Sequence, residues 1–145
     1  MATNTRMKLI SSGKKWEGDV AYSQCFRCEA GPLLFLSGQV SIDPAGKVVG
    51  HGDLALQTRT VFGNIKDLLA AGGSTMEDVI KLTYFVVDMK NWSDVQKVRA
   101  EFFPRHHPAS TTVEVSGLHK EEYLIEIEAI AVAHRTSAAL PRKTY

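Results

Sequence analysis

The sequence predicts an α+β fold in which one mixed β-sheet carries two helices on one face. Short β-prone apolar runs lie toward both ends of the chain, and two intervening segments repeat apolar residues every three or four positions. The segments follow the order β-β-α-β-α-β-β. Because each helix has a single apolar stripe to bury, the economical arrangement packs both helices on the same side of the sheet.

The length of 145 residues is that of one ordinary domain. We expect a single domain over residues 1–134 and a loose C-terminal tail over residues 135–145, where no periodicity is visible. The chain has 17 basic and 16 acidic side chains, a balance that argues against binding to nucleic acid or to an anionic membrane. No apolar run reaches membrane-spanning length and the N-terminus lacks a signal-peptide core, so we expect a cytoplasmic protein.

The first half of the chain predicts a hairpin and then a helix. Val20–Cys28 and Leu33–Ile42 are apolar and β-prone, and the EAGP between them is typical of a turn. Asp53 is well placed to cap the helix that follows, and a pair of glycines ends that helix at residues 72 and 73. Its predicted buried stripe has the spacing of an amphipathic helix: Leu54, Thr58, Val61, Ile65 and Leu68.

A capping box, a central strand and a second helix are predicted next. Ser74 precedes Glu77 by three residues, which is the capping-box spacing. The β-branched run Val79–Val87 is typical of a central strand. Asn91–Pro104 returns to helical spacing and ends at its proline, with an apolar stripe of Val95, Val98 and Phe102.

Two strands close the predicted sheet, Ser110–Leu118 and Tyr123–His134, with the charged turn HKEE between them. In the last strand one face carries Ile125, Ile127, Ala129 and Ala131, and the other carries Glu126 and Glu128 among further apolar residues. The face without helices is therefore still largely apolar. We expect another copy of the chain to cover it, as an oligomer that packs sheet against sheet.

Neither the cysteines nor the paired histidines predict a metal site. Cys25 and Cys28 form a single C-x-x-C, whereas a zinc site normally needs two such pairs or added histidines. In a strand, residues three apart point to opposite faces, which favours two separate thiols. His106 and His107 are adjacent and have no acidic residue at ligand spacing, so we expect a solvated loop. No metal or other cofactor is predicted.

Several separate motifs resemble one known family. The quoted segments are AYSQ at 21–24, LSGQV at 36–40, NIKDLLAAGGSTMEDVIKLTYFVVDM at 64–89, AEFF at 100–103 and IEIEAIAV at 125–132. They resemble the Rid family, also called YjgF/YER057c/UK114 and endoribonuclease L-PSP. The resemblance implies a chorismate-mutase-like fold, a homotrimer with ligand clefts between subunits, and hydrolysis of reactive imines or enamines without a cofactor.

The resemblance also implies which residues form the cleft. Tyr22 matches the family's cleft tyrosine, Ser37 and Gly38 match its SGQ loop, and Thr112 matches a position often held by cysteine. Glu126 matches the acid that positions water. A carboxylate can orient or deprotonate a water molecule that attacks an iminium carbon, so this set is chemically coherent.

One matched position departs from the family pattern. Ser110 stands where the best-studied members carry an arginine that binds the substrate carboxylate. A charge-assisted hydrogen bond is worth about 1.5–3 kcal/mol, so its loss should weaken the binding of a small imino acid by at least about one to two powers of ten. Lys90 stands where many relatives have asparagine. Lys90, Arg105, His106 and His107 are the candidate replacement cations.

Three functions stay open at the level of sequence. The first is a Rid-like hydrolytic deaminase with an atypical substrate anchor at Ser110. The second is a non-catalytic trimer that binds or senses a small metabolite in the cleft between subunits. The third, a ribonuclease, follows only from a name used for some relatives, and the near-neutral charge argues against it.

Overall fold

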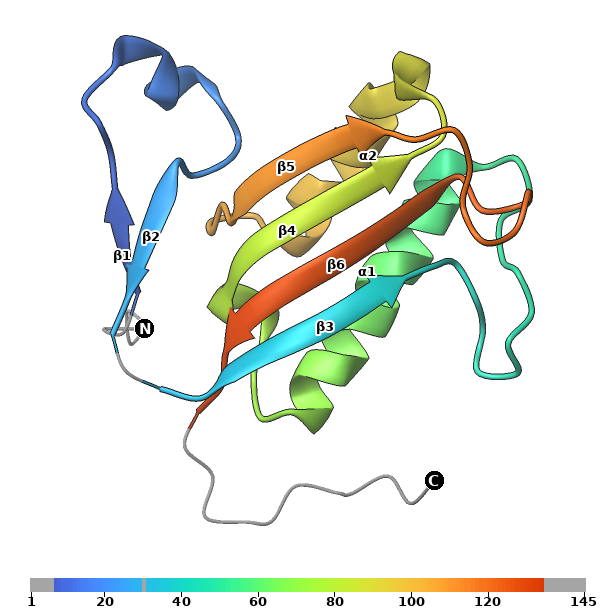
Figure 1. Ribbon diagram of the computed structural model, residues 1–145, viewed down its shortest axis with the longest axis horizontal. Helices are drawn as coiled ribbons and strands as arrows, with labels where there is room; N and C mark the ends of the chain where they lie inside the picture. The colour runs from blue at the N-terminus through green and yellow to red at the C-terminus, as the bar shows by residue number, and fades with distance from the viewer. Residues whose placement is uncertain (1–6, 30, 135–145) are drawn as a thin grey trace.

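The computed structural model describes residues 7–29 and 31–134 and arranges them as a four-stranded sheet, a smaller two-stranded sheet and two α-helices (Figure 1). The larger sheet has the strand order β3-β6-β4-β5. The strands are β1 (Met7–Ile10), β2 (Cys25–Cys28), β3 (Leu33–Gln39), β4 (Val79–Val86), β5 (Ala109–Glu114) and β6 (Ile125–Val132). The helices are α1 (Leu54–Ala71) and α2 (Trp92–Phe102), with short 3-10 turns η1 (Lys15–Asp19), η2 (Met76–Asp78) and η3 (Met89–Asn91).

The larger sheet is mixed, as predicted. Strand β4 pairs in parallel with β5 and antiparallel with β6, while β3 pairs antiparallel with β6. The β3–β6 register shifts between Leu36 and Gln39, which marks a β-bulge. Strands β4 and β6 are therefore central, and β3 and β5 form the two edges.

Both α-helices lie on one face of this sheet, and the other face is bare in Figure 1. The alternation predicted for the last strand is confirmed, because every second residue of β6 is buried against the helices. The core between the layers contains Val61, Phe62, Ile65 and Leu69 from α1, Leu82, Tyr84 and Val86 from β4, and Ile125, Ile127, Ala129 and Ala131 from β6.

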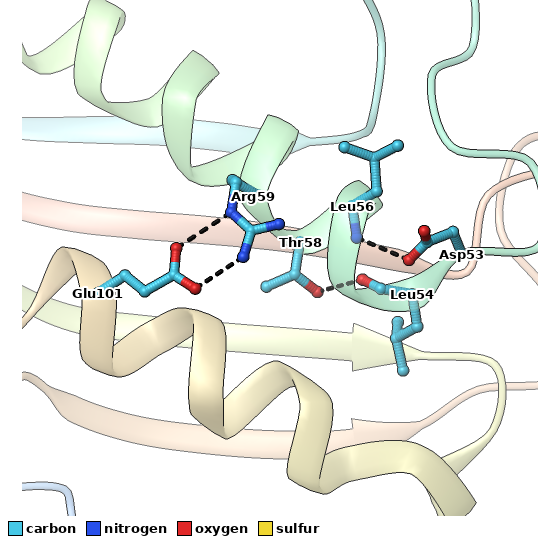
Figure 2. Close-up of polar contacts among 6 residues, drawn as sticks. All are labelled: Asp53, Leu54, Leu56, Thr58, Arg59 and Glu101. Carbon is cyan, nitrogen blue, oxygen red and sulfur yellow. Dashed lines mark hydrogen bonds and ion pairs between the residues drawn. The ribbon is translucent and has the colours of Figure 1, made fainter.

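Helix α1 begins at the residue that the sequence indicated. The Asp53 carboxylate accepts a hydrogen bond of 2.9 Å from the backbone N–H of Leu56, and this N-cap is drawn in Figure 2. The helix is also tied to α2, since the Arg59 guanidinium donates to both carboxylate oxygens of Glu101 at 3.0 and 2.6 Å (Figure 2). The two helices thus form one layer above the sheet.

The predicted N-terminal hairpin is wrong. Strand β2 covers only the last four residues of Val20–Cys28, and it pairs with β1, a strand that the sequence did not predict. Strand β3 pairs with β6 instead. Pairing with the longer apolar β6 lets β3 pack Leu34 and Leu36 against the core, whereas β2 is only four residues long and carries Arg27 on one face.

Two local predictions also need correction. Leu68 is 44% exposed, and Leu69 takes its place in the buried stripe because the spacing of four from Ile65 keeps Leu69 on the core side. The capping box joins Thr75 to Asp78, not Ser74 to Glu77. Ser74 is buried and donates to the Val132 carbonyl at 2.8 Å.

The closing strands are shorter than predicted. Strand β5 ends at Glu114, level with the end of β4 at Val86, and β6 begins two residues after Tyr123, which is buried outside the strand. The predicted tail, residues 135–145, lies outside the described residues. Within the part of the chain that is described, no helix combines the length and apolar character needed to cross a membrane.

Candidate functional site

A cavity of about 430 Å³ lies beside the edge strand β5 and brings three predicted site residues together. Tyr22, Ser110 and Thr112 all line it. The other walls come from α2 and from residues 19–21. The cavity is therefore built by three separate parts of the chain, and only β5 belongs to the main sheet.

Strand β5 presents Ser110 and Thr112 on the helix side of the sheet. In the parallel ladder Ser110 lies opposite Leu82 and Thr112 opposite Tyr84, and both of these β4 residues are buried under the helices. Side chains alternate along a strand, so Ser110 and Thr112 share that face. Because β5 is the edge strand, its hydroxyl side chains border an open cavity instead of the core.

The segment that carries Tyr22 is attached to the start of β5. The Ser23 N–H donates to the Pro108 carbonyl at 3.4 Å, the Ser23 hydroxyl donates to the His107 carbonyl, and Ser23 forms an isolated parallel bridge with Ala109. These contacts, and not the predicted hairpin with β3, bring Tyr22 to the cavity.

The loop before this segment is organised by Glu17. Its carboxylate accepts hydrogen bonds from the Ser11 hydroxyl and from the hydroxyl and N–H of Ser12. The Ser11 hydroxyl, followed by that of Ser12, holds the pKa of Glu17 below its usual value. This turn precedes Asp19, which stands at the rim of the cavity.

Helix α2 supplies three cavity residues that the sequence reasoning missed: Trp92, Gln96 and Arg99. Their spacing of four and then three residues places them on one face of the helix. Val95 and Val98, which the sequence did assign to the core, are buried on the neighbouring face. The spacing of these three residues in the sequence already indicates a second helix face with both aromatic and polar side chains. Only the position of β5 shows that this face borders a cavity.

Glu126 does not line this cavity. It alternates with the buried Ile125 and Ile127, so its side chain lies on the bare face of the sheet, opposite to that of Ser110 and Thr112. Gly38, in the β-bulge of β3, packs directly against it: a Cβ on Gly38 would lie 1.9 Å from Glu126 Oε1.

The bare face also carries exposed apolar and charged groups. Phe35 is 73% exposed, and Leu33 and Val113 are also exposed. The Lys81 ammonium donates to the Thr111 hydroxyl, and burial lowers the pKa of Lys81 although the charge of Glu128 opposes this effect. Ser37 lies on the same strand edge as Phe35, one residue before Gly38.

The cations proposed to replace the missing arginine lie elsewhere. The Lys90 side chain is 86% exposed and pairs with Asp88 at 3.7 Å, and the Arg105 guanidinium pairs with Glu77 at 3.0 Å. Neither lines the cavity.

The two histidines differ from each other. The solvated-loop expectation is wrong for His106, because its ring is partly buried, contacts the Val79 carbonyl through Nε2 and packs against Phe26 and Phe103. His107 is exposed, as expected. Neither ring reaches the cavity that Tyr22 lines.

The cysteines are free, with Cys25 exposed and Cys28 partly buried on the opposite side of β2. Burial, with a smaller contribution from Cys25, raises the pKa of the Cys28 thiol. Across residues 7–29 and 31–134, no group of three or more histidine, cysteine or acidic side chains could hold a metal ion.

A family model described as Endoribonuclease L-PSP matches residues 14–133. The chain belongs to this family. Among L-PSP relatives, a RutC family protein of Pyrococcus horikoshii is 46% identical over 110 residues, which cover 76% of this chain and 85% of the relative. The protein DfrA of Myxococcus xanthus is 38% identical over 126 residues, which cover 87% of this chain and 95% of DfrA.

Solved L-PSP family structures share the fold. YyfB, a Rid family protein of Yersinia pestis, superposes with a TM-score of 0.79 at 30% identity, covering 88% of this chain and 98% of that one. Yeast Mmf1 superposes with a TM-score of 0.68 at 29% identity, and the match covers 92% of this chain and 98% of Mmf1. The fold expected from the resemblance to the Rid family is therefore confirmed.

Proposed function

We propose that this L-PSP family protein is a Rid-type hydrolytic deaminase that acts on a reactive imine or enamine. Its catalytic cleft would lie between neighbouring copies in a homotrimer. One copy would contribute the cavity of Tyr22, Ser110 and Thr112, and the other would contribute Glu126 with the Ser37–Gly38 turn.

The observation that carries this proposal is the separation of the predicted residues into two groups on opposite faces of one sheet. Ser110 and Thr112 lie on the helix side at the β5 edge, and Glu126 lies on the bare side against Gly38. A site that uses both groups needs a second copy. The exposed Phe35 on the bare side supports contact between copies, because large exposed apolar groups mark association surfaces.

The chemistry needs water, a base and a means of orienting the imine. In the proposed reaction the Glu126 carboxylate takes a proton from water as the oxygen attacks the C=N carbon. The nitrogen gains a proton, the resulting carbinolamine loses ammonia as its C–N bond breaks, and a carbonyl product remains. No electrons are exchanged with another reactant, so no redox cofactor is required.

The direct test is to generate imines with an amino-acid oxidase and to follow their disappearance by semicarbazide trapping. We expect faster loss of imine with the protein present, and Glu126→Gln should reduce the rate at least about a hundred-fold, the usual scale for general-base catalysis. Glu128→Gln is the matched control, since Glu128 lies two residues along the same face of β6. Equal rates with and without the wild-type protein would refute the proposal.

Ser110 favours one alternative, a non-catalytic trimer that binds a small metabolite. A neutral hydroxyl cannot replace the bidentate contact of a guanidinium with a carboxylate, and binding tolerates the loss of a group better than catalysis does. Stabilisation by a keto acid in a thermal-shift assay, without turnover of any imine, would support this alternative. Ser110→Arg should increase hydrolysis of 2-aminoacrylate if the scaffold is Rid-like.

The proposed setting is the cytoplasm, where free thiols such as Cys25 and Cys28 stay reduced. The family description also names an endoribonuclease activity. RNA cleavage that persisted in purified Glu126→Ala protein would point to a contaminant.

A further inference from the structure

The cavity beside β5 contains a buried cation that the proposed chemistry leaves without a role. Arg99 lies on α2, lines the cavity with Ser110 and is only 8% exposed. Within residues 7–29 and 31–134, none of the ion pairs includes Arg99. Burying an unpaired charge is costly, and buried arginines are normally paired.

A second buried polar group lies next to this cation. The Tyr84 hydroxyl is fully buried, and no described residue gives it a hydrogen bond of suitable geometry. The Arg99 guanidinium is nonetheless close to it: burial raises the pKa of Tyr84 far above its usual value, and the charge of Arg99, followed by a hydrogen-bonding contribution from the same guanidinium, opposes that rise. The Tyr84 ring also packs edge-to-face on the Trp92 ring, with 5.2 Å between the ring centroids. Tyr84, Arg99 and Trp92 therefore form one cluster beside the cavity.

Among the described residues, Asp19 is the one carboxylate that lines the cavity, and it does not neutralise this charge. Asp19 is exposed at the rim, and it forms no ion pair with Arg99. The positive charge is therefore available to an anion that enters the cavity.

We propose that the cavity binds a small aromatic carboxylic acid and that Arg99 holds its carboxylate. A guanidinium matches a carboxylate with two parallel hydrogen bonds. The Ser110 and Thr112 hydroxyls supply neutral hydrogen bonds, and the rings of Trp92 and Tyr22 supply an apolar surface for the rest of the ligand. The volume of about 430 Å³ lies within the usual range for small-molecule pockets.

The cation of this site thus comes from α2, across the cavity from Ser110. The inference rests on the same cavity as the proposed deaminase, but it concerns binding and does not require turnover. With Arg99 as the anchor, the carboxylate of the ligand points toward α2 and not along β5.

Isothermal titration calorimetry with benzoate and with its neutral analogue benzamide tests this assignment. We expect wild-type protein to bind benzoate at millimolar concentration and to bind it more tightly than benzamide. Arg99→Gln should lower the affinity for benzoate at least about ten-fold, which corresponds to the loss of one charge-assisted contact, and should leave the affinity for benzamide unchanged. Arg105→Gln is the matched control, since Arg105 pairs with Glu77 outside the cavity.

Two results would overturn the inference: no binding of benzoate by the wild type, or equal benzoate affinity in the wild type and Arg99→Gln. Arg99→Met adds a readout on the free protein, because removing a buried charge that no described carboxylate pairs with should keep or raise the melting temperature. A large fall in that temperature, with unchanged benzoate affinity, would give Arg99 a structural role. Benzoate binding through Arg99 without imine turnover would keep this inference and remove the deaminase proposal.

Discussion

At the scale of single residues, Glu126 and Gly38 depend on each other. Glu126 is partly buried on the bare face of the sheet, and its carboxylate occupies the space that a side chain at position 38 would need. The absence of a Cβ at Gly38 therefore fixes where the carboxylate can lie. The group that approaches this glycine most closely is the Glu126 carboxylate.

Gly38→Ala should displace the Glu126 carboxylate and reduce imine hydrolysis about as much as Glu126→Gln does. A Cβ at this position would lie 1.9 Å from Oε1 and 2.7 Å from Cδ of Glu126, so the side chain must move. The double variant Gly38→Ala with Glu126→Gln should be no slower than Glu126→Gln alone, because both changes remove the same group. Steady-state rates on the same imine measure this.

Gly63→Ala is the control for that experiment. Gly63 lies within α1 and nothing would contact its Cβ, so alanine should stabilise the helix by about 0.5–1 kcal/mol and leave activity unchanged. Additive losses in the double variant at positions 38 and 126 would contradict the proposed dependence.

At the scale of elements, the helices were predictable because their signals are local. Asp53 and the glycine pair after Ala71 set the ends of α1 where the sequence indicated them. The capping box has two candidates in the sequence, because Ser74 and Thr75 both have an acidic residue three positions later. Burial of Ser74 against the Val132 carbonyl, a contact between distant segments, decides in favour of Thr75.

Asp53→Ala should reduce the free energy of unfolding by about 1 kcal/mol, the usual cost of losing an N-cap. The carboxylate accepts from the Leu56 N–H at 2.9 Å, and alanine leaves that donor unpaired. Chemical denaturation gives the difference. Asp67→Ala, at an exposed position within the same helix, should change stability by less than half as much as Asp53→Ala does. Equal losses in the two variants would show that the cap is not the cause.

At the scale of the whole molecule, the layers were predictable and the pairing of distant strands was not. Alternation in β6 and the stripes of α1 and α2 were sufficient to place both helices on one face. Strand β2 pairs with β1 because β3 pairs with β6 instead. The β3–β6 pairing joins segments that are far apart in the sequence, so local signals do not predict it. For the same reason Tyr22 was found by family resemblance, whereas Arg99 could be found only after α2 and β5 were placed.

The bare face predicts how copies associate. Phe35→Glu should weaken self-association and shift the protein toward monomers, because a charge replaces a side chain that is 73% exposed on the face proposed to be covered. Leu68→Glu is the control, since Leu68 is exposed on α1, on the other side of the molecule. Sedimentation velocity measures both. An unchanged trimer in Phe35→Glu, or a monomeric wild type, would contradict the proposed assembly.

Mixing two inactive variants tests the central claim, a catalytic cleft shared between copies. Glu126→Gln lacks the base, and Ser110→Trp fills the cavity on the other side of the sheet. Trimers formed from an equal mixture should recover about a quarter of the wild-type rate of imine hydrolysis, because each cleft draws at random on two copies. If native mass spectrometry finds mixed oligomers and the rate stays at the level of the separate variants, the shared cleft is wrong.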